Sequence, residues 1–386
     1  MKTYKTLFEE NKAWALEIFK KIDAKESKVA VRSRDKLPYT VDENGSHISR
    51  PGAATSWWTN GFFGGMNALL YNYTKNEEYL KTLQSSERLL DGAFSENYNI
   101  LHHDVGFLWH LTSGANLALT GSEASKKRAF YAAATLAGRF INGGDFIKAW
   151  NTTHAYNWTI IDSMMNLPLL YNASTLFADD RYKRMAMAHA DSTIASHIRP
   201  DGSVAHQAEH DRDTGEVVAT YGGQGSGVGS SWSRGQAWAL YGFVISYIHT
   251  EEERYLDAAK RVANYFIANC CDDWLPRVDF RSAAEPIYYD STAGACAACG
   301  LIELAKLLPE CEGGMYMYAA VNIMKAMTEK FANFDTECDN LLDYGTERYP
   351  TEGDLKKAGV HINIIYGDFF YVEAILKMLG SDFMIW

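Results

Sequence analysis

Two kinds of helical segment alternate along the chain. Six segments carry charged residues on one side and apolar residues on the other, which is typical of helices at a protein surface. Between them lie six segments rich in glycine, aromatic and small residues, and such all-round apolar helices are normally buried. We predict surface helices at 6–22, 76–91, 124–140, 180–197, 251–269 and 315–332, and buried helices that begin near 59, 104, 161, 232, 290 and 367.

The order of these segments predicts six helical hairpins, each with one inner and one outer helix. Such hairpins can close into a double ring, the (α/α)6 barrel, or stack as an open solenoid. Their irregular spacing favours the barrel, because long loops usually carry function. We therefore expect an all-α fold in which residues 1–386 form a single (α/α)6-barrel catalytic domain. Strand signal is weak, apart from short hairpins near 200–222.

Charge and composition exclude several classes of protein. The 37 basic and 48 acidic residues give a net charge of −11, whereas nucleic acids and anionic membranes attract basic surfaces. The N-terminal segment lacks the apolar core of a signal peptide, so we expect a cytoplasmic location. Without that signal the six cysteines are expected to be free thiols, and Cys296 and Cys299 are expected to pack in the core.

Polar or acidic residues mark the starts of several predicted inner helices. These residue types cap helix N-termini, and capping alone is one explanation for them. If all inner helices run in the same direction, their starts would also meet at one end of the barrel and line a pocket. The stretches concerned are Trp58 to Phe62, Asp104, Asp162, Trp232 to Gly235, Asp290 to Thr292, and Gly367 with Asp368.

Asp104 and Asp162 are the candidate catalytic residues, because each directly precedes an apolar helix. Two carboxyls between apolar walls can differ in pKa, one ionised and one protonated. That difference suits general acid and base catalysis, as in the hydrolysis of sugar bonds. His102 and His103 superficially resemble metal ligands, but adjacent residues at a helix start are not expected to face each other. We therefore expect no metal site and no organic cofactor.

Five further residues are candidates for contact with a substrate. His206 and Gln224 fall in predicted loops, Gln224 within a glycine-rich run that is either a binding loop or a mere connection. Arg234 begins an apolar helix, where a guanidinium needs an anion from the protein or from a substrate. Trp58 and Trp238 would either stack on sugar rings or belong to the core.

An ordered set of motifs resembles the unsaturated glucuronyl hydrolases, glycoside hydrolase family 88. The resemblance runs from about Trp58 to the C-terminus. It is carried by WTNGFFGG at 58–65, HHDVGFL at 102–108, IDSMMNLPLLY at 161–171, SWSRGQAWALYGF at 231–243 and YGDFFYVEAI at 366–375. The related unsaturated rhamnogalacturonyl hydrolases share the fold and the chemistry, but the second and fourth motifs look more like the glucuronyl group.

This resemblance implies an enzyme that hydrates the C4=C5 double bond which polysaccharide lyases leave on a uronic acid. The implied ligand is a small anionic unsaturated oligosaccharide of the glycosaminoglycan type, and no cofactor is implied. Asp162 matches the general acid and base of the family, and Asp104 matches its supporting aspartate. The family's substrate contacts match Trp58, His206, Gln224, Arg234 and Trp238. We expect a monomer or a homodimer.

Departures from the family pattern and alternative functions stay open at this point. The patch Ser-x-x-Ser-x-Lys, which some members that accept sulfated sugars carry before the last Gly-Asp, is absent, although Lys356 and Lys357 lie near. The alternatives are a rhamnogalacturonyl-type hydrolase, a carbohydrate-binding barrel without activity, and an epimerase of the N-acylglucosamine type. A binding barrel would need no paired carboxylates, and an epimerase would need histidines at the ends of inner helices.

Overall fold

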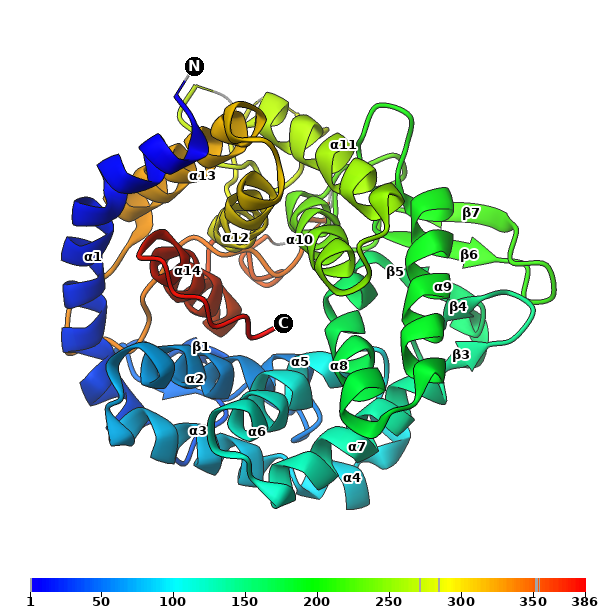
Figure 1. The fold of residues 1–386 in the computed structure, drawn as a ribbon, viewed down its shortest axis with the longest axis horizontal. Helices are drawn as coiled ribbons and strands as arrows, with labels where there is room; N and C mark the ends of the chain where they lie inside the picture. Colours follow the sequence, from blue (N-terminus) through cyan, green and yellow to red (C-terminus); the bar gives the residue numbers. More distant parts are fainter. Residues whose placement is uncertain (1, 271, 284, 351–352, 354) are drawn as a thin grey trace.

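The computed structural model describes residues 2–270, 272–283, 285–350, 353 and 355–386. Two concentric rings of helices make up most of the protein (Figure 1), and the predicted (α/α)6 barrel is confirmed. In the described residues the outer ring consists of α1 (Tyr4–Arg32), α3 (Glu77–Leu89), α7 (Glu123–Ala137), α9 (Asp180–His197), α11 (Glu253–Asn269) and α13 (Glu310–Phe331). The inner ring consists of α2 (Phe62–Thr74), α5 (Val105–Trp109) with its continuation α6 (Ala115–Thr120), α8 (Leu167–Phe177), α10 (Ser233–Thr250), α12 (Ser291–Leu307) and α14 (Ile365–Met378).

The position of each helix follows from its surface. The outer helix α11 buries one apolar face, which includes Val262 and Phe266, and exposes Asp257 and Arg261 on the other. The inner helix α12 is buried on every side from its start to Ala305. Since only the inner ring is apolar all round, it forms the core and the outer ring covers it.

Two details of the helices differ from the predictions. The first outer helix continues to Arg32, ten residues beyond the predicted end at 22. One inner helix is interrupted between α5 and α6 by a π-helical turn, η3 (His110–Gly114). Such turns occur mostly as single insertions in α-helices, and the amino-acid pattern alone does not reveal them.

Short elements connect the helices. The hairpin predicted near 200–222 is present as β6 (Gln207–His210) and β7 (Val217–Tyr221), and β5 (Trp158–Ile160) joins it in an antiparallel sheet of order β5-β6-β7. The two smaller hairpins were not predicted, because each strand has two residues. These elements are β1 (Thr40–Val41) with β2 (His47–Ile48) and β3 (Phe140–Ile141) with β4 (Phe146–Ile147). The remaining short helices are α4 (Gly92–Ser95), η1 (Trp58–Gly61), η2 (Tyr98–Ile100), η4 (Thr153–Ala155) and η5 (Ile161–Met165).

The first turns of the inner helices meet at one end of the barrel, as the helix starts predicted. Aromatic rings from four of these starts lie against one another there. The centroids of Trp58 and Tyr366 are 4.9 Å apart, and Phe107 lies 5.6 Å from Trp58 and 5.5 Å from Trp238. This aromatic cluster forms the floor beneath the polar residues of the same helix starts.

The C-terminal segment lies near the centre of the ring in Figure 1. Trp386 is buried there, where its indole N–H donates to the Glu373 carboxylate and its ring stacks on Phe370. Cys296 and Cys299 are buried in the core as predicted, and no disulfide is seen among the described cysteines, whereas Cys271 lies outside the described residues. In the described part of the chain, no helix has the length and apolar character needed to cross a membrane.

The contact between α10 and η5 should be sensitive to one added carbon atom. A Cβ at Gly242 would lie 2.5 Å from the Cβ of Met164. We expect Gly242→Ala to lower the free energy of unfolding by about 1–3 kcal/mol, since overpacked cores must shift. Urea denaturation measures this value. Gly92→Ala is the control, because its nearest new contact is a flexible Glu96 side chain at 3.6 Å; equal stability of the two variants would contradict close packing at Gly242.

Candidate active site

Asp104 and Asp162 are brought together by one buried amide, the side chain of Asn166. Its Nδ2 donates to the Asp104 carboxylate at 3.4 Å and to the main-chain carbonyl of Asp162 at 3.2 Å. Its Oδ1 accepts the backbone N–H of Phe107 at 2.8 Å. Gly106 has to be a glycine, because a Cβ there would lie 2.6 Å from this Oδ1. The start of α5 is therefore held directly against η5, which carries Asp162.

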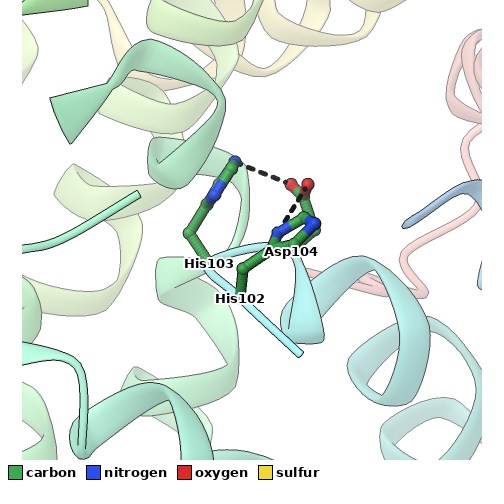
Figure 2. Close-up of side chains that lie close together, drawn as sticks. All are labelled: His102, His103 and Asp104. Atoms are coloured by element: carbon green, nitrogen blue, oxygen red, sulfur yellow. Dashed lines mark ion pairs between the residues drawn. The ribbon is translucent and has the colours of Figure 1, made fainter. Parts of the chain in front are cut away.

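The Asp104 carboxylate lies between two histidine side chains, as Figure 2 shows. Its Oδ1 is 3.1 Å from Nε2 of His103, and its Oδ2 is 3.3 Å from Nδ1 of His102. The expectation that these three neighbours in sequence do not face one another is wrong. They precede α5 in a turn rather than on a regular helix, so the spacing of helical side chains does not apply.

The surroundings of this cluster determine which of its groups is charged. Burial opposes charge on His103, but the Asp104 carboxylate outweighs burial and raises the pKa of His103. Burial likewise opposes charge on Asp104, but the charge and hydrogen bond of His103 lower the pKa of Asp104. Burial lowers the pKa of His102 to about 4, against the attraction of Asp104. The cluster is thus an ion pair of His103 and Asp104 beside a neutral His102.

These three residues could also be considered as metal ligands, because one atom of each lies within 4.8 Å of the others. His103 donates from Nδ1 to the carbonyl of Ala149 at 2.8 Å, so only its Nε2 could ligate. That nitrogen is the one that faces Asp104 in the ion pair. A metal would have to displace its proton, since an imidazolium has no lone pair. The expectation of no metal stays a prediction.

His206 contacts Asp162 and is held in one tautomer. The backbone N–H of Gln224 donates to Nδ1 of His206 at 2.8 Å. The ring proton is therefore on Nε2, which donates to Oδ1 of Asp162 at 3.1 Å. Gly223 precedes Gln224 with φ of +59°, and a Cβ there would overlap His206. The glycine-rich run thus approaches the imidazole more closely than any side chain would allow, and its role as a binding loop stays a prediction.

Arg234 is buried, with 1 % of its surface exposed, and its anion comes from the protein. Its Nη1 lies 3.2 Å from the Asp290 carboxylate, and its two terminal nitrogens donate to the carbonyls of Thr346 and Glu347. The guanidinium also lies 4.1 Å from the ring of Trp232. Of the two sources of an anion for Arg234, the structure shows the carboxylate of the protein; contact with a substrate stays a prediction.

The two candidate tryptophans lie at different depths. Trp58 is the partly exposed member of the aromatic cluster, and its contact with a sugar stays a prediction. Trp238 is 0 % exposed and packs between Phe107 and Phe370 at 5.5 Å from each. Trp238 therefore belongs to the core of the site, and direct stacking of this residue on a sugar stays a prediction.

Two residues of the site were missed from the sequence, Asn166 and Glu347. Asn166 stands four residues after Asp162 in the IDSMMN motif, so helical spacing could have placed both on one face. Glu347 lies in a loop far along the chain, and its main-chain carbonyl accepts hydrogen bonds from the side chains of Arg234 and Gln224. No local pattern indicated that contact.

Comparisons with known proteins agree with this arrangement. The chain matches Glycosyl Hydrolase Family 88 over residues 33–273. It is 32% identical to the unsaturated glucuronyl hydrolase of Bacillus sp. strain GL1, over 89% of this chain and 91% of the relative. This chain belongs to glycoside hydrolase family 88.

Other family 88 proteins and their structures resemble the chain over most of its length. An unsaturated chondroitin disaccharide hydrolase of Streptococcus pyogenes serotype M1 is 31% identical over 83% of this chain and 80% of the relative. The crystal structure of the Bacillus sp. GL1 hydrolase, described as responsible for glycosaminoglycan degradation, has a TM-score of 0.84 at 30% identity, covering 92% of this chain and 95% of that one. An unsaturated glucuronyl hydrolase specific for heparin has a TM-score of 0.82 at 25% identity, with the same coverage.

In this family 88 protein a cavity of about 390 Å³ lies beside Gln224. Its walls are the glycines that flank Gln224, together with Arg348, Pro350, Lys357 and Ala358. Two cationic side chains thus line a cavity next to the His206 loop of a protein whose net charge is −11. An anionic group would be attracted to this location.

The ion pair of His103 and Asp104 should give stability a defined pH dependence. The raised pKa of His103 contributes stability at low pH that is lost as pH rises through that pKa, and the lowered pKa of Asp104 contributes stability that is lost as pH falls. We expect His103→Gln to lose about 3 kcal/mol of unfolding free energy at about pH 6 and clearly less at about pH 9.

Urea denaturation at the two pH values measures this difference. His154→Gln serves as the control, because His154 is exposed and no ion pair of its side chain is seen among the described residues. An equal loss at both pH values in His103→Gln would show that the pair is not ionised in the folded protein.

Proposed function

We propose that the protein is an unsaturated glucuronyl hydrolase, which releases a 4,5-unsaturated uronic acid from oligosaccharides that a lyase has produced. The observation that carries this proposal is that one carboxylate is available for chemistry. Both carboxylate oxygens of Asp104 face histidines, and Oδ1 also accepts a hydrogen bond from Asn166. On Asp162, Oδ1 accepts His206, while no hydrogen bond to Oδ2 is seen from the described residues.

An enzyme with one available carboxylate fits hydration better than ordinary glycoside hydrolysis. Hydrolysis at the anomeric carbon uses two carboxyls in separate roles on either side of the bond. Addition of water to a vinyl ether needs one group that first gives a proton and then accepts one. In this proposal Oδ2 of Asp162 serves both steps, which is supported by the hydrogen bond of His206 to the other oxygen.

In the proposed reaction Asp162 donates its proton to C4, and positive charge develops at C5. The resulting carboxylate takes a proton from a water molecule, whose hydroxyl bonds to C5. The C5 hemiketal opens to a ketone, which leaves C1 as a hemiacetal, and that hemiacetal expels the aglycone sugar. One water is consumed and Asp162 ends the cycle protonated. Asp104 stays ionised by its pairing with His103 and favours the positive charge that develops near it.

The substrate that we propose is a glycosaminoglycan-type disaccharide. The relatives are named as hydrolases of unsaturated glucuronyl and chondroitin disaccharide substrates. The cations Arg348 and Lys357 near Gln224 support an anionic ligand. Trp58 and Gln224, which are partly exposed, are the substrate contacts that the site supports best. The buried side chains of His206, Arg234 and Trp238 would act from beneath them. A cytoplasmic location, a monomer or homodimer, and a single domain remain predictions.

The absorbance of the conjugated double bond tests this proposal directly. We expect the wild-type protein to remove the ultraviolet band of an unsaturated chondroitin or hyaluronan disaccharide. Asp162→Asn should slow this loss by about 10²–10⁴-fold, the usual contribution of a general acid and base. Asp257→Asn, on the exposed face of α11, is the matched control and should keep full activity.

Two results would contradict the proposal. If Asp162→Asn keeps wild-type activity, the proton donor is another group. If the wild-type protein leaves the band of chondroitin, hyaluronan, heparin and rhamnogalacturonan disaccharides unchanged, the barrel is a binding protein and not a hydrolase of this class.

A further inference from the structure

In the described residues, the backbone N–H of Gln224 is the donor that sets the tautomer of His206. In the neutral ring, Nε2 carries the proton that faces Asp162 only while Nδ1 is an acceptor, and Nδ1 accepts a hydrogen bond from the N–H of Gln224. If that N–H moved away, the ring proton could pass to Nδ1. Nε2 would then present a lone pair to the Asp162 carboxylate, and the contact would become repulsive.

Gln224 is itself fixed by contacts with a loop more than a hundred residues further along the chain. Its carbonyl accepts the backbone N–H of Tyr349 at 2.7 Å. Its side-chain Nε2 donates to the carbonyl of Glu347 at 2.9 Å. The backbone N–H, the carbonyl and the side chain of Gln224 are therefore all held, two of them by the segment 347–349.

Glu347 is anchored through its own carboxylate. Arg50 donates from both terminal nitrogens, at 2.6 and 3.0 Å, in a bidentate pair, and the Tyr39 hydroxyl donates to the same carboxylate. The guanidinium of Arg50 lies 4.3 Å from the ring of Trp57, which fixes its plane. Burial opposes charge on Glu347, but the hydrogen bonds of Arg50 and Tyr39 lower the pKa of Glu347. Glu347 is thus ionised and held by the loop that precedes the first inner helix.

We propose that Glu347, anchored by Arg50, is a positioning residue for the reaction. Its carbonyl holds Gln224, the Gln224 N–H holds the tautomer of His206, and Nε2–H of His206 orients Asp162. The importance of this chain of contacts for catalysis rests on the proposed function. The contacts themselves are present in the structure whatever the function is.

A second contact limits the expected size of the effect. The carbonyl of Glu347 also accepts Nη2 of Arg234 at 2.7 Å, and this donor stays when the carboxylate is removed. Loss of the pair with Arg50 should therefore loosen the loop rather than release it. We expect a partial loss of the His206 tautomer and a moderate loss of turnover.

The test compares Glu347→Gln with wild type in two independent measurements. The first is the ¹⁵N spectrum of the His206 imidazole without substrate, assigned by its absence in His206→Asn. In wild type Nδ1 should appear as an acceptor nitrogen without a proton, and in Glu347→Gln it should shift toward a mixture of tautomers. The second is turnover of unsaturated chondroitin disaccharide, where we expect kcat to fall about tenfold with KM changed less than about twofold.

Matched variants separate positioning from general damage to the fold. Glu78→Gln removes the partner of Arg34, a second Arg–Glu pair outside the site, and should change neither the spectrum nor kcat. Arg50→Lys keeps the charge but loses the bidentate geometry, and it should show the same spectral shift as Glu347→Gln even if the latter folds poorly. Exchange of the two charges, Arg50→Glu with Glu347→Arg, should restore part of both signals.

Each outcome decides the proposal. An unchanged imidazole spectrum in Glu347→Gln and Arg50→Lys overturns it, whatever happens to kcat. A shifted spectrum with unchanged kcat shows that the tautomer is set as described but does not serve catalysis, and this also overturns the positioning role. If wild type acts on no unsaturated disaccharide, the proposed function fails, and the spectrum alone still shows whether Glu347 holds the tautomer.

Discussion

The close packing of the inner helices is the constraint on which the rest of the structure depends. Gly300 of α12 lies against α10, where a Cβ would come within 3.1 Å of the Cα of Tyr241. A Cβ at Gly65 of α2 would likewise lie 3.0 Å from the ring of Phe369 of α14. Helices that approach in this way leave almost no freedom to slide, because interiors are packed to crystal-like density. The first turns of these helices are therefore fixed relative to one another, and so are the polar side chains that they carry.

The two aspartates differ in behaviour because their neighbours differ. Asp104 faces an imidazolium that burial and pairing keep in the site, so its charge is compensated locally. Asp162 faces a neutral His206 that donates a single hydrogen bond. A buried charge is tolerated where it is paired. The same residue type thus lies in two different electrostatic surroundings within one site.

Buried charged side chains further along the inner helices are also paired. Tyr241 and Trp386 both donate to the Glu373 carboxylate, and Lys377 lies 2.9 Å from Glu303. Burial opposes charge on Lys377, but the Glu303 carboxylate outweighs it and raises the pKa of Lys377. In this part of the core the polar groups satisfy one another. At the helix starts, by contrast, no hydrogen bond to Oδ2 of Asp162 is seen from the described residues, and a cavity lies beside Gln224.

The sequence by itself determined the fold class and named two aspartates as candidate catalytic residues. The alternation of amphipathic and apolar segments is a local property, so it revealed the two rings, and the helix starts revealed Asp104 and Asp162. Only the tertiary structure decided the partners of these residues. The pairing of His103 with Asp104 depends on a turn, and the anion of Arg234 and the burial of Trp238 depend on which helices are neighbours. Glu347 and Gln224 are separated by more than a hundred residues, and their contact follows from closure of the barrel, which no local spacing of residues encodes.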